Sequence, residues 1–230
     1  MNIAIIPARG GSKRIIRKNI RNFCGKTLIS YSIQAAIDSK LFDHVIVSTD
    51  DYDMAAEAKA LGAEVPFMRP DYLSDDFTGT NAVVKHAIQW IEKNWKPVEY
   101  VCCIYATAPF LQFFFLKKGI NDLIKSGKSF AFSVTTFSFP IQRAIKIDAN
   151  KNITPFDEDS IGKRSQDIEE MYHDAGQFYW GTKQAFLENR KIFSSESIPV
   201  ILPRHLVQDI DTEEDWKQAE LMYRALFLSS

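Results

Sequence analysis

The sequence predicts an α/β protein in which helices pack on a mostly parallel sheet. Short apolar runs alternate along the chain with longer stretches that have the period of a helix. The chain has 230 residues and is 46% hydrophobic, which is enough to bury one substantial core. We therefore expect a single domain over residues 1–230.

The first unit of the predicted fold is a strand, a loop and a helix. Residues 3–6 form a short apolar run typical of a buried strand. After a polar stretch, Ile29, Ile33, Ala36 and Ile37 recur at the spacing of one helical face. This order places the intervening loop at the carboxyl end of the first strand.

The second unit repeats the pattern, with an apolar strand at residues 44–48 and a helix at 52–61. Gly62 follows that helix in the position where glycine commonly ends one. The later elements continue the alternation, with strands at residues 100–104, 130–134 and 178–180 and helices at about 80–94 and 114–124.

Residues 137–174 interrupt the alternation. They contain an alternating piece at residues 145–147, a turn-rich stretch at 148–152, and a polar, acidic remainder that offers little to a core. We expect a hairpin-like arm inserted in the domain, with a mobile surface loop as the open alternative. Such an arm could pack on a second subunit, so we expect a homodimer.

Composition limits the classes of function. The net charge of −1 excludes a protein-wide field for capturing nucleic acid. The three cysteines form no C-x-x-C pair, which suits a reducing cytoplasm. The apolar stretch before Pro7 spans about five residues, too short for a signal peptide, and no window reaches the length of a membrane span. We expect a cytoplasmic protein with no membrane partner.

The strongest functional signal is the segment 7–14, directly after the first strand. Gly10 and Gly11 allow the backbone to approach a ligand and turn its N–H groups toward an anion. Residues 1–37 carry seven cations and no acidic residue to compensate them: Arg9, Lys13, Arg14, Arg17, Lys18, Arg21 and Lys26. At the carboxyl end of a strand, where ligands usually bind in such sheets, this charge predicts a polyanion site.

Three other interpretations of this segment are weaker. Gly25, Lys26 and Thr27 resemble the end of a Walker A loop, but Ile20 stands where that motif needs its first glycine. A nucleic-acid patch would need interleaved aromatic residues, which the segment lacks, so we expect no nucleic-acid partner. A solvated basic face would not explain why glycines and cations occur together at a strand end.

Asp209 and Asp211 are the second functional signal in the sequence. In an extended segment, residues i and i+2 point to the same side, so both carboxylates can face one hard cation such as Mg²⁺. The alternative is helix capping, with Thr212 as N-cap and Asp215 in the capping-box position. Capping explains Thr212 and Asp215 but leaves the alternating pair unexplained.

Other candidate side chains lie near predicted strand ends and helix starts: Arg69, Thr78, Thr80, Tyr105, His173, Asp174 and Gln177. The threonines before the helix at about residue 80 could hold a base or ribose, or act only as a cap. His173, Asp174 and Gln177 precede the strand predicted at residues 178–180. A lone histidine is most often structural, so His173 remains open.

Taken together, the segments 6–13, 18–20, 25–26, 48–51, 69–70 and 209–212 resemble the acylneuraminate cytidylyltransferase family over nearly the whole chain. The segments 105–110 and 172–180 are similar to its pseudaminic acid branch. Ile16 and Thr27 depart from the family pattern, since prolines are common there. The resemblance implies a three-layer Rossmann-like nucleotidyltransferase fold with a small protruding dimerisation hairpin.

The resemblance also implies roles for individual residues. Arg9, Lys18 and Asp211 would be catalytic, and Asp209 and Asp211 would hold Mg²⁺. The nucleotide would contact Ala8, Arg9, Gly10, Gly11, Ser12, Lys13, Asn19, Arg69, Thr78 and Thr80. The sugar would contact Tyr105, His173, Asp174, Gln177 and Tyr179.

The implied reaction transfers CMP from CTP to the anomeric hydroxyl of pseudaminic acid, an acidic nine-carbon sugar, and releases pyrophosphate. Its product would serve surface glycan or flagellin glycosylation. A sialic or legionaminic acid synthetase is the alternative within the class. A non-catalytic nucleotide- or RNA-binding module is the alternative outside it.

Overall fold

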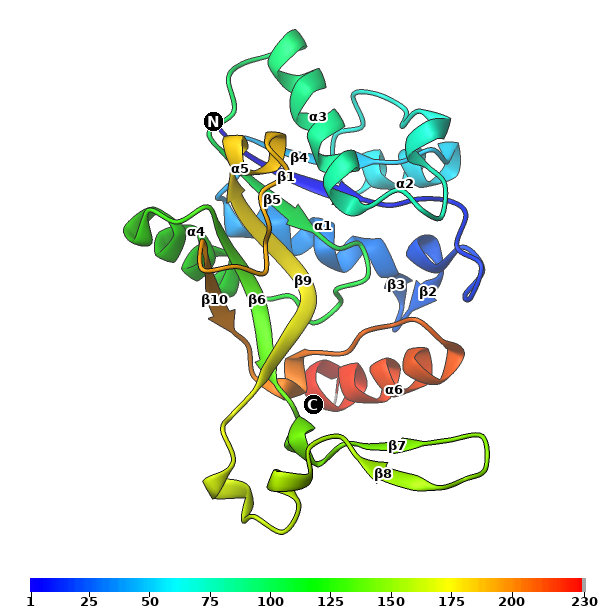
Figure 1. The fold of residues 1–230 in the computed structure, drawn as a ribbon. Helices are drawn as coiled ribbons and strands as arrows, with labels where there is room; N and C mark the ends of the chain where they lie inside the picture. Colours follow the sequence, from blue (N-terminus) through cyan, green and yellow to red (C-terminus); the bar gives the residue numbers. More distant parts are fainter. Residues whose placement is uncertain (229–230) are drawn as a thin grey trace.

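The computed structural model describes residues 1–228 and contains a six-stranded sheet of order β10-β6-β9-β5-β1-β4 (Figure 1). The strands of this sheet are β1 (Asn2–Pro7), β4 (His44–Ser48), β5 (Tyr100–Ile104), β6 (Phe130–Thr136), β9 (Tyr172–Thr182) and β10 (Ser197–Ile201). Its strand pairs are parallel except for those of β9, which is antiparallel to both neighbours. The predicted α/β class with a mostly parallel, mixed sheet is confirmed.

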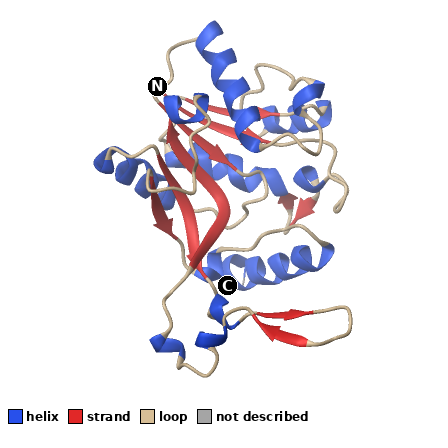
Figure 2. Cartoon of the chain, in the orientation of Figure 1, coloured by secondary structure: helices blue, strands red, loops and turns tan. Residues whose placement is uncertain are grey.

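Helices cover both faces of the sheet, as Figure 2 shows in blue around the red strands. The α-helices are α1 (Leu28–Ser39), α2 (Tyr52–Ala60), α3 (Thr80–Asn94), α4 (Phe113–Ser126), α5 (Lys183–Leu187) and α6 (Glu213–Tyr223). Short 3₁₀ turns are η1 (Lys18–Ile20), η2 (Asp71–Leu73), η3 (Ile141–Arg143), η4 (Glu158–Ser160), η5 (Ser165–Asp167) and η6 (Arg204–Leu206), and η7 (Arg224–Leu228) is a π-helical turn.

Two apolar layers follow from the alternation of side chains along buried strands. On β1, Ile3 and Ile5 pack into the cluster that contains α3 and α5. Ala4 and Ile6 pack on the opposite face, with α1, α2, α4 and α6. Both faces of β1 are therefore buried, which is why its sequence is an unbroken apolar run. The three-layer arrangement is confirmed.

β9 is longer than predicted. The strand expected at residues 178–180 runs from Tyr172 to Thr182, so His173, Asp174 and Gln177 lie within it and not before it. Its pairing with β6 is irregular between Phe132 and Val134, and Gly176 has a φ of 61°. This bulge interrupts the apolar pattern with polar residues, which hid the first half of the strand from sequence analysis.

The excursion predicted at about residues 137–174 leaves the sheet after β6 and returns at β9. It carries a two-stranded antiparallel hairpin of β7 (Ile145–Ile147) and β8 (Ile153–Pro155), which projects below α6 in the view of Figure 1. The predicted hairpin is confirmed. A second small pair, β2 (Asn22–Phe23) and β3 (Lys26–Thr27), precedes α1.

Among residues 1–228, no helix combines the length and apolar character that crossing a bilayer requires. The three cysteines are free, and adjacent Cys102 and Cys103 are buried on opposite faces of the sheet. Burial raises the pKa of both thiols.

Candidate active site

The carboxyl ends of β1 and β5 form the place where a ligand is expected in this topology. From β1 the chain continues to β4 on one side, and then crosses to β5 on the other side of β1. In open α/β sheets such a reversal of direction opens a crevice between the loops that follow the strands. The segment after β1 begins at Ala8, and the segment after β5 begins at Tyr105.

The glycines after β1 allow close packing within the protein. The Gly10 N–H donates to the Asp50 carboxylate at 2.9 Å, and a Cβ on Gly10 would lie 2.8 Å from Asp51 Oδ2. Gly11 is exposed, and a Cβ there would meet nothing within 4 Å. Ala8 is fully buried and donates its N–H to Ser48. Gly10 therefore fixes the loop against the end of β4, a role different from the anion nest predicted for it.

The N-terminal cations are not uncompensated in the folded protein, which corrects the sequence interpretation. Six of the seven form ion pairs with acidic residues from later segments: Arg9 and Lys13 with Asp76, Arg14 and Lys18 with Asp211, Arg17 with Asp51 and Asp53, and Arg21 with Glu213. These pairs link the loop after β1 to two acidic segments. Sequence analysis missed them because the partners are distant in the chain.

Four of these cations surround a cavity of about 590 Å³. Its lining comprises Arg9, Ser12, Lys13, Arg14, Lys18, Asn19, Asp76, Thr80, Tyr105 and Asp211. Lys18 Nζ donates to the Ile210 carbonyl at 2.6 Å and lies 3.4 Å from Asp211 Oδ1. Arg14 Nη2 lies 2.9 Å from the same oxygen. Arg9 and Asp211, at opposite ends of the sequence, therefore line one cavity, which we name the cation cavity.

The segment of Asp209 and Asp211 joins this cavity to a capped helix. Thr212 caps α6 through the Asp215 N–H, and the Asp215 carboxylate returns the bond to the Thr212 N–H. The capping box is thus confirmed, yet it involves neither the Asp209 nor the Asp211 carboxylate. Asp209 as a whole residue is exposed to solvent. Partial burial of its carboxyl group and the negative charge of Asp211 nevertheless raise the pKa of Asp209.

Two carboxylates two positions apart in the chain can accept a hard cation when both face it. Within residues 1–228 no three His, Cys, Asp or Glu side chains gather into a metal site. An ion held by Asp209 and Asp211 would therefore complete its coordination with water and phosphate oxygens, as Mg²⁺ commonly does.

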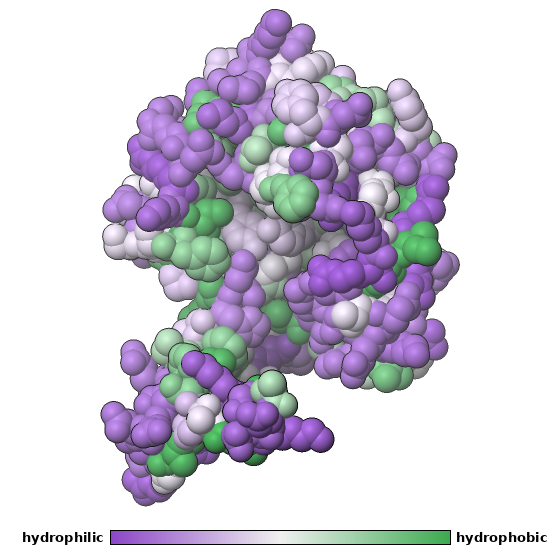
Figure 3. All heavy atoms as spheres, turned by 45° about the vertical axis from the view of Figure 1, so that its right-hand side comes forward, coloured by the Kyte–Doolittle hydropathy of each residue, from purple (hydrophilic) through white to green (hydrophobic). Residues whose placement is uncertain are grey.

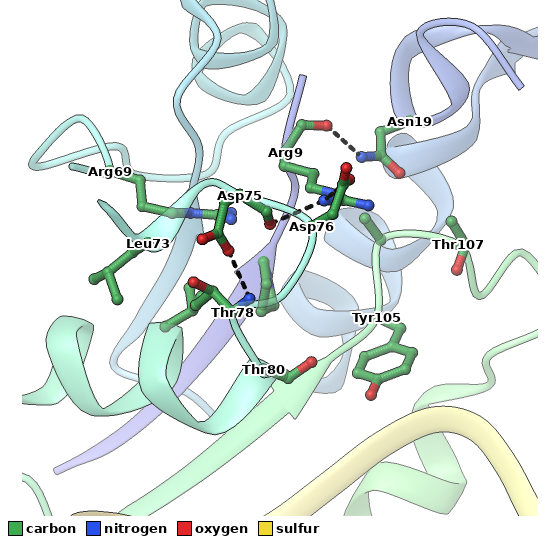
Figure 4. A pocket seen from close by; sticks show the side chains of 13 residues that line it. Arg9, Asn19, Arg69, Leu73, Asp75, Asp76, Thr78, Thr80, Tyr105 and Thr107 are labelled. Atoms are coloured by element: carbon green, nitrogen blue, oxygen red, sulfur yellow. Dashed lines mark hydrogen bonds and ion pairs between the residues drawn. The ribbon is translucent and has the colours of Figure 1, made fainter. Parts of the chain in front are cut away.

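A second cavity of about 280 Å³ adjoins the first (Figure 4). The residues around it include Arg69, Thr78, Thr80, Arg9, Asn19 and Tyr105. Of these six, Arg69 and Thr78 do not line the cation cavity, and the other four line both cavities. Arg69 is 5% exposed, and its Nε donates to Ser48 Oγ at 3.2 Å. Burial lowers the pKa of this guanidinium. Asn19 donates from its amide to the Arg9 carbonyl at 3.2 Å, which joins η1 to the loop after β1.

A third cavity of about 130 Å³ has a largely apolar lining. Thr80 and Tyr105 border all three cavities, so the three are neighbours. Tyr179 donates from its hydroxyl to Asp174 at 2.5 Å, and both line the third cavity. Burial raises the pKa of Tyr179, so its hydroxyl stays protonated. Phe186 and Phe193 also line the cavity, and sequence analysis missed them because they follow β9 as ordinary apolar residues.

His173 and Gln177 do not line these three cavities. The His173 ring lies 4.8 Å from the Phe137 ring, and its Nδ1 is 2.8 Å from the Asp174 carbonyl oxygen. Gln177 is buried and donates to the Leu206 carbonyl at 2.5 Å. The structure therefore places these two predicted sugar contacts in packing positions outside the three cavities.

This geometry can hold a polyanion close to the carboxylate of Asp211, and the sequence relationship decides the family. A family model described as cytidylyltransferase matches residues 3–226. The chain belongs to the cytidylyltransferase family. The resemblance seen in the sequence is thereby confirmed.

Relatives of this cytidylyltransferase match it over nearly its full length. It is 47% identical over 223 residues to a pseudaminic acid cytidylyltransferase of Campylobacter jejuni subsp. jejuni serotype O:2, covering 97% of this chain and 96% of the relative. It is 30% identical to a CMP-N,N'-diacetyllegionaminic acid synthase of Legionella pneumophila, covering 95% and 94%. A solved CMP:2-keto-3-deoxy-manno-octonic acid synthetase complexed with CTP shares the fold, with a TM-score of 0.70 at 15% identity and coverage of 98% and 99%.

Proposed function

We propose that this cytidylyltransferase transfers CMP from CTP to the anomeric hydroxyl of pseudaminic acid and releases pyrophosphate. The observation that carries the proposal is the meeting of Lys18 and Asp211, 193 positions apart, in one cavity beside the loop after β1. The substrate is inferred from the relative in Campylobacter jejuni at 47% identity. The free, buried Cys102 and Cys103 also suit a reducing cytoplasm, where the reaction would occur.

The residues have distinct roles in this reaction. Arg9 and Lys13 would hold the β- and γ-phosphates, and Lys18 would stabilise the charge that develops at the α-phosphate. The sugar hydroxyl oxygen forms a bond to the α-phosphorus as the bond to the pyrophosphate oxygen breaks. The hydroxyl proton passes to a base or to solvent. Catalysis then depends on positioning and charge neutralisation, without a covalent intermediate on the protein.

Asp209 and Asp211 would hold Mg²⁺ next to the triphosphate. When bound, this ion would neutralise part of the negative charge of the phosphates. Arg14 and Lys18, which pair with Asp211 in this structure, would then be available to phosphate oxygens. The second cavity, with Arg69, Thr78 and Thr80, would receive the cytosine and ribose. Tyr105, Asp174 and Tyr179 would face the sugar acid.

Pyrophosphate release tests this proposal. The purified protein is incubated with CTP, Mg²⁺ and a panel of nine-carbon sugar acids, and we expect turnover with pseudaminic acid at a higher kcat/KM than with sialic or legionaminic acid. Preference for another sugar acid would overturn the substrate but not the chemistry. Nucleotide binding without any magnesium-dependent pyrophosphate release would favour a binding module instead.

We further propose that the arm, residues 137–171, mediates a homodimer. Apolar side chains on it are unusually exposed, with Phe139 at 83%, Ile147 at 65% and Ile153 at 62%. Figure 3 shows hydrophobic groups on the projecting lobe that this arm forms. A monomeric protein seldom leaves such a patch in water, and β7 and β8 are too short to be stable alone.

Sedimentation equilibrium tests the dimer. We expect the wild-type protein to be dimeric at micromolar concentrations. The double variant Ile147→Asp/Ile153→Asp should be monomeric, because it places charges in the apolar contact. Leu221→Asp, an exposed apolar position on α6, serves as the control and should stay dimeric. A wild-type monomer, or a variant that remains dimeric, would overturn the proposed interface.

A further inference from the structure

Asp76 occupies a position that no step of the proposed reaction uses. It follows η2 in the segment between Arg69 and α3, and its carboxylate binds two cations of the loop after β1. Asp76 Oδ1 accepts from Arg9 Nη1 at 2.7 Å, and Oδ2 accepts from Lys13 Nζ. The two cations lower the pKa of Asp76, so this carboxylate is charged at neutral pH. One acidic side chain thus bridges the two groups proposed to hold the β- and γ-phosphates.

The backbone around Asp76 is arranged to present this carboxylate. Asp75 Oδ1 accepts the N–H groups of Phe77 at 3.0 Å and Thr78 at 2.6 Å, which closes a tight turn. The Asp75 carbonyl accepts a further bond from Arg9 Nη1 at 3.0 Å. Phe77 at the tip is 94% exposed and does not anchor the turn to the core. The turn is therefore ordered within itself, and its attachment to the loop after β1 passes largely through Arg9 and Lys13.

A triphosphate and the Asp76 carboxylate would compete for the same cations. Asp76 lines both the cation cavity and the adjoining cavity of about 280 Å³, so its carboxylate lies beside the space proposed for the phosphates. Several phosphate charges placed beside an ionised carboxylate would repel it. Both ion pairs are partly exposed, with side-chain exposures of 38% for Arg9 and 79% for Lys13, so they are weak enough to be exchanged.

We propose that Asp76 is an internal substitute for a phosphate group: it holds Arg9 and Lys13 in the nucleotide-free protein, and a triphosphate or pyrophosphate displaces it. The inference rests on the proposed function for the identity of the nucleotide. Part of the binding free energy of the β- and γ-phosphates is then used to separate the turn from Arg9 and Lys13. The return of Asp76 to Arg9 and Lys13 then competes with pyrophosphate and aids its release.

Isothermal titration calorimetry on Asp76→Asn tests this inference with three ligands at one magnesium concentration: CTP, pyrophosphate and CMP. Removing the competing charge should tighten CTP and pyrophosphate binding by about 2- to 10-fold, the range expected for one or two exposed ion pairs. CMP lacks the β- and γ-phosphates, so its affinity should be unchanged. Pyrophosphate should also become a stronger product inhibitor of the variant.

Asp71→Asn is the matched control. Asp71 lies in η2 of the same segment and is exposed, and it forms no ion pair among the residues that the structure describes. The change removes the same charge from the same segment, so all three affinities should stay within about twofold if direct contact with Arg9 and Lys13 is what matters.

The outcomes separate this inference from the proposed function. Weaker CTP binding in Asp76→Asn, or equal changes for CTP and CMP, would overturn the substitute role and make Asp76 a ligand or a structural residue. Turnover of CTP with unchanged pyrophosphate affinity would also overturn it, while leaving the proposed function intact. Tighter pyrophosphate binding in a protein that binds no CTP would support the role of Asp76 and overturn the proposed function.

Discussion

We expect Asp211→Asn to lower kcat by about 1000-fold while the protein remains folded. Metal ions that stabilise transition-state charge contribute several kcal/mol, and each 1.36 kcal/mol corresponds to about tenfold in rate. Asparagine keeps the shape of the side chain but removes the charge that would hold Mg²⁺ against the triphosphate. The Asp211 carboxylate takes no part in the capping box of α6, so the helix should persist. Pyrophosphate release with CTP and Mg²⁺ measures kcat, and urea unfolding measures stability.

Glu214→Gln provides the comparison for that experiment. Glu214 is an exposed acid in the first turn of α6, three positions after Asp211, and it does not line the cation cavity. Its variant should keep kcat within about twofold and lose at most about 0.5 kcal/mol of stability. Near-normal turnover by Asp211→Asn would contradict the metal role and leave Asp211 only as an ion-pair partner of Arg14 and Lys18.

The parts of the fold that the sequence revealed are those whose residues are buried on both sides. The strands at residues 44–48 and 100–104 coincide with β4 and β5, because both strands bury apolar side chains on both of their faces and therefore read as apolar runs. β10 was not predicted. It is a short edge strand, and Pro199 in its middle argues against a strand when the sequence is considered alone.

Some residues of the candidate site could be predicted from the sequence, and others could not. The glycines and cations after β1 and the pair Asp209/Asp211 were visible because each is local in sequence. Asp50 and Asp76 were missed, since each acts on the loop after β1 from a different segment and carries no motif. One signal was available for Asp76. Residues 71–76 contain three acids, and a segment of seven cations without acids must find its counter-charges elsewhere in the chain.

The second large effect is expected for Lys18→Met, which should lower kcat by about 100- to 1000-fold with a much smaller change in KM. Lys18 is 17% exposed and reaches the Ile210 carbonyl and the Asp211 carboxylate inside the cation cavity. A fixed positive charge there stabilises the α-phosphate more in the transition state than in the ground state, so its loss should appear in kcat. Methionine keeps an unbranched, flexible side chain that extends as far as Cε and lacks the ammonium group.

Arg21→Met is the matched control, because Arg21 joins the same two segments of the chain outside the cation cavity. Its guanidinium pairs with Glu213 at 2.5 Å and lies 4.4 Å from the centroid of the Trp216 ring. If Lys18 only held residues 209–216 in place, both variants would lose activity alike. We expect Arg21→Met to lose stability but to keep kcat within about threefold. A Lys18→Met protein that raises KM at unchanged kcat would show that the ammonium group serves nucleotide binding alone.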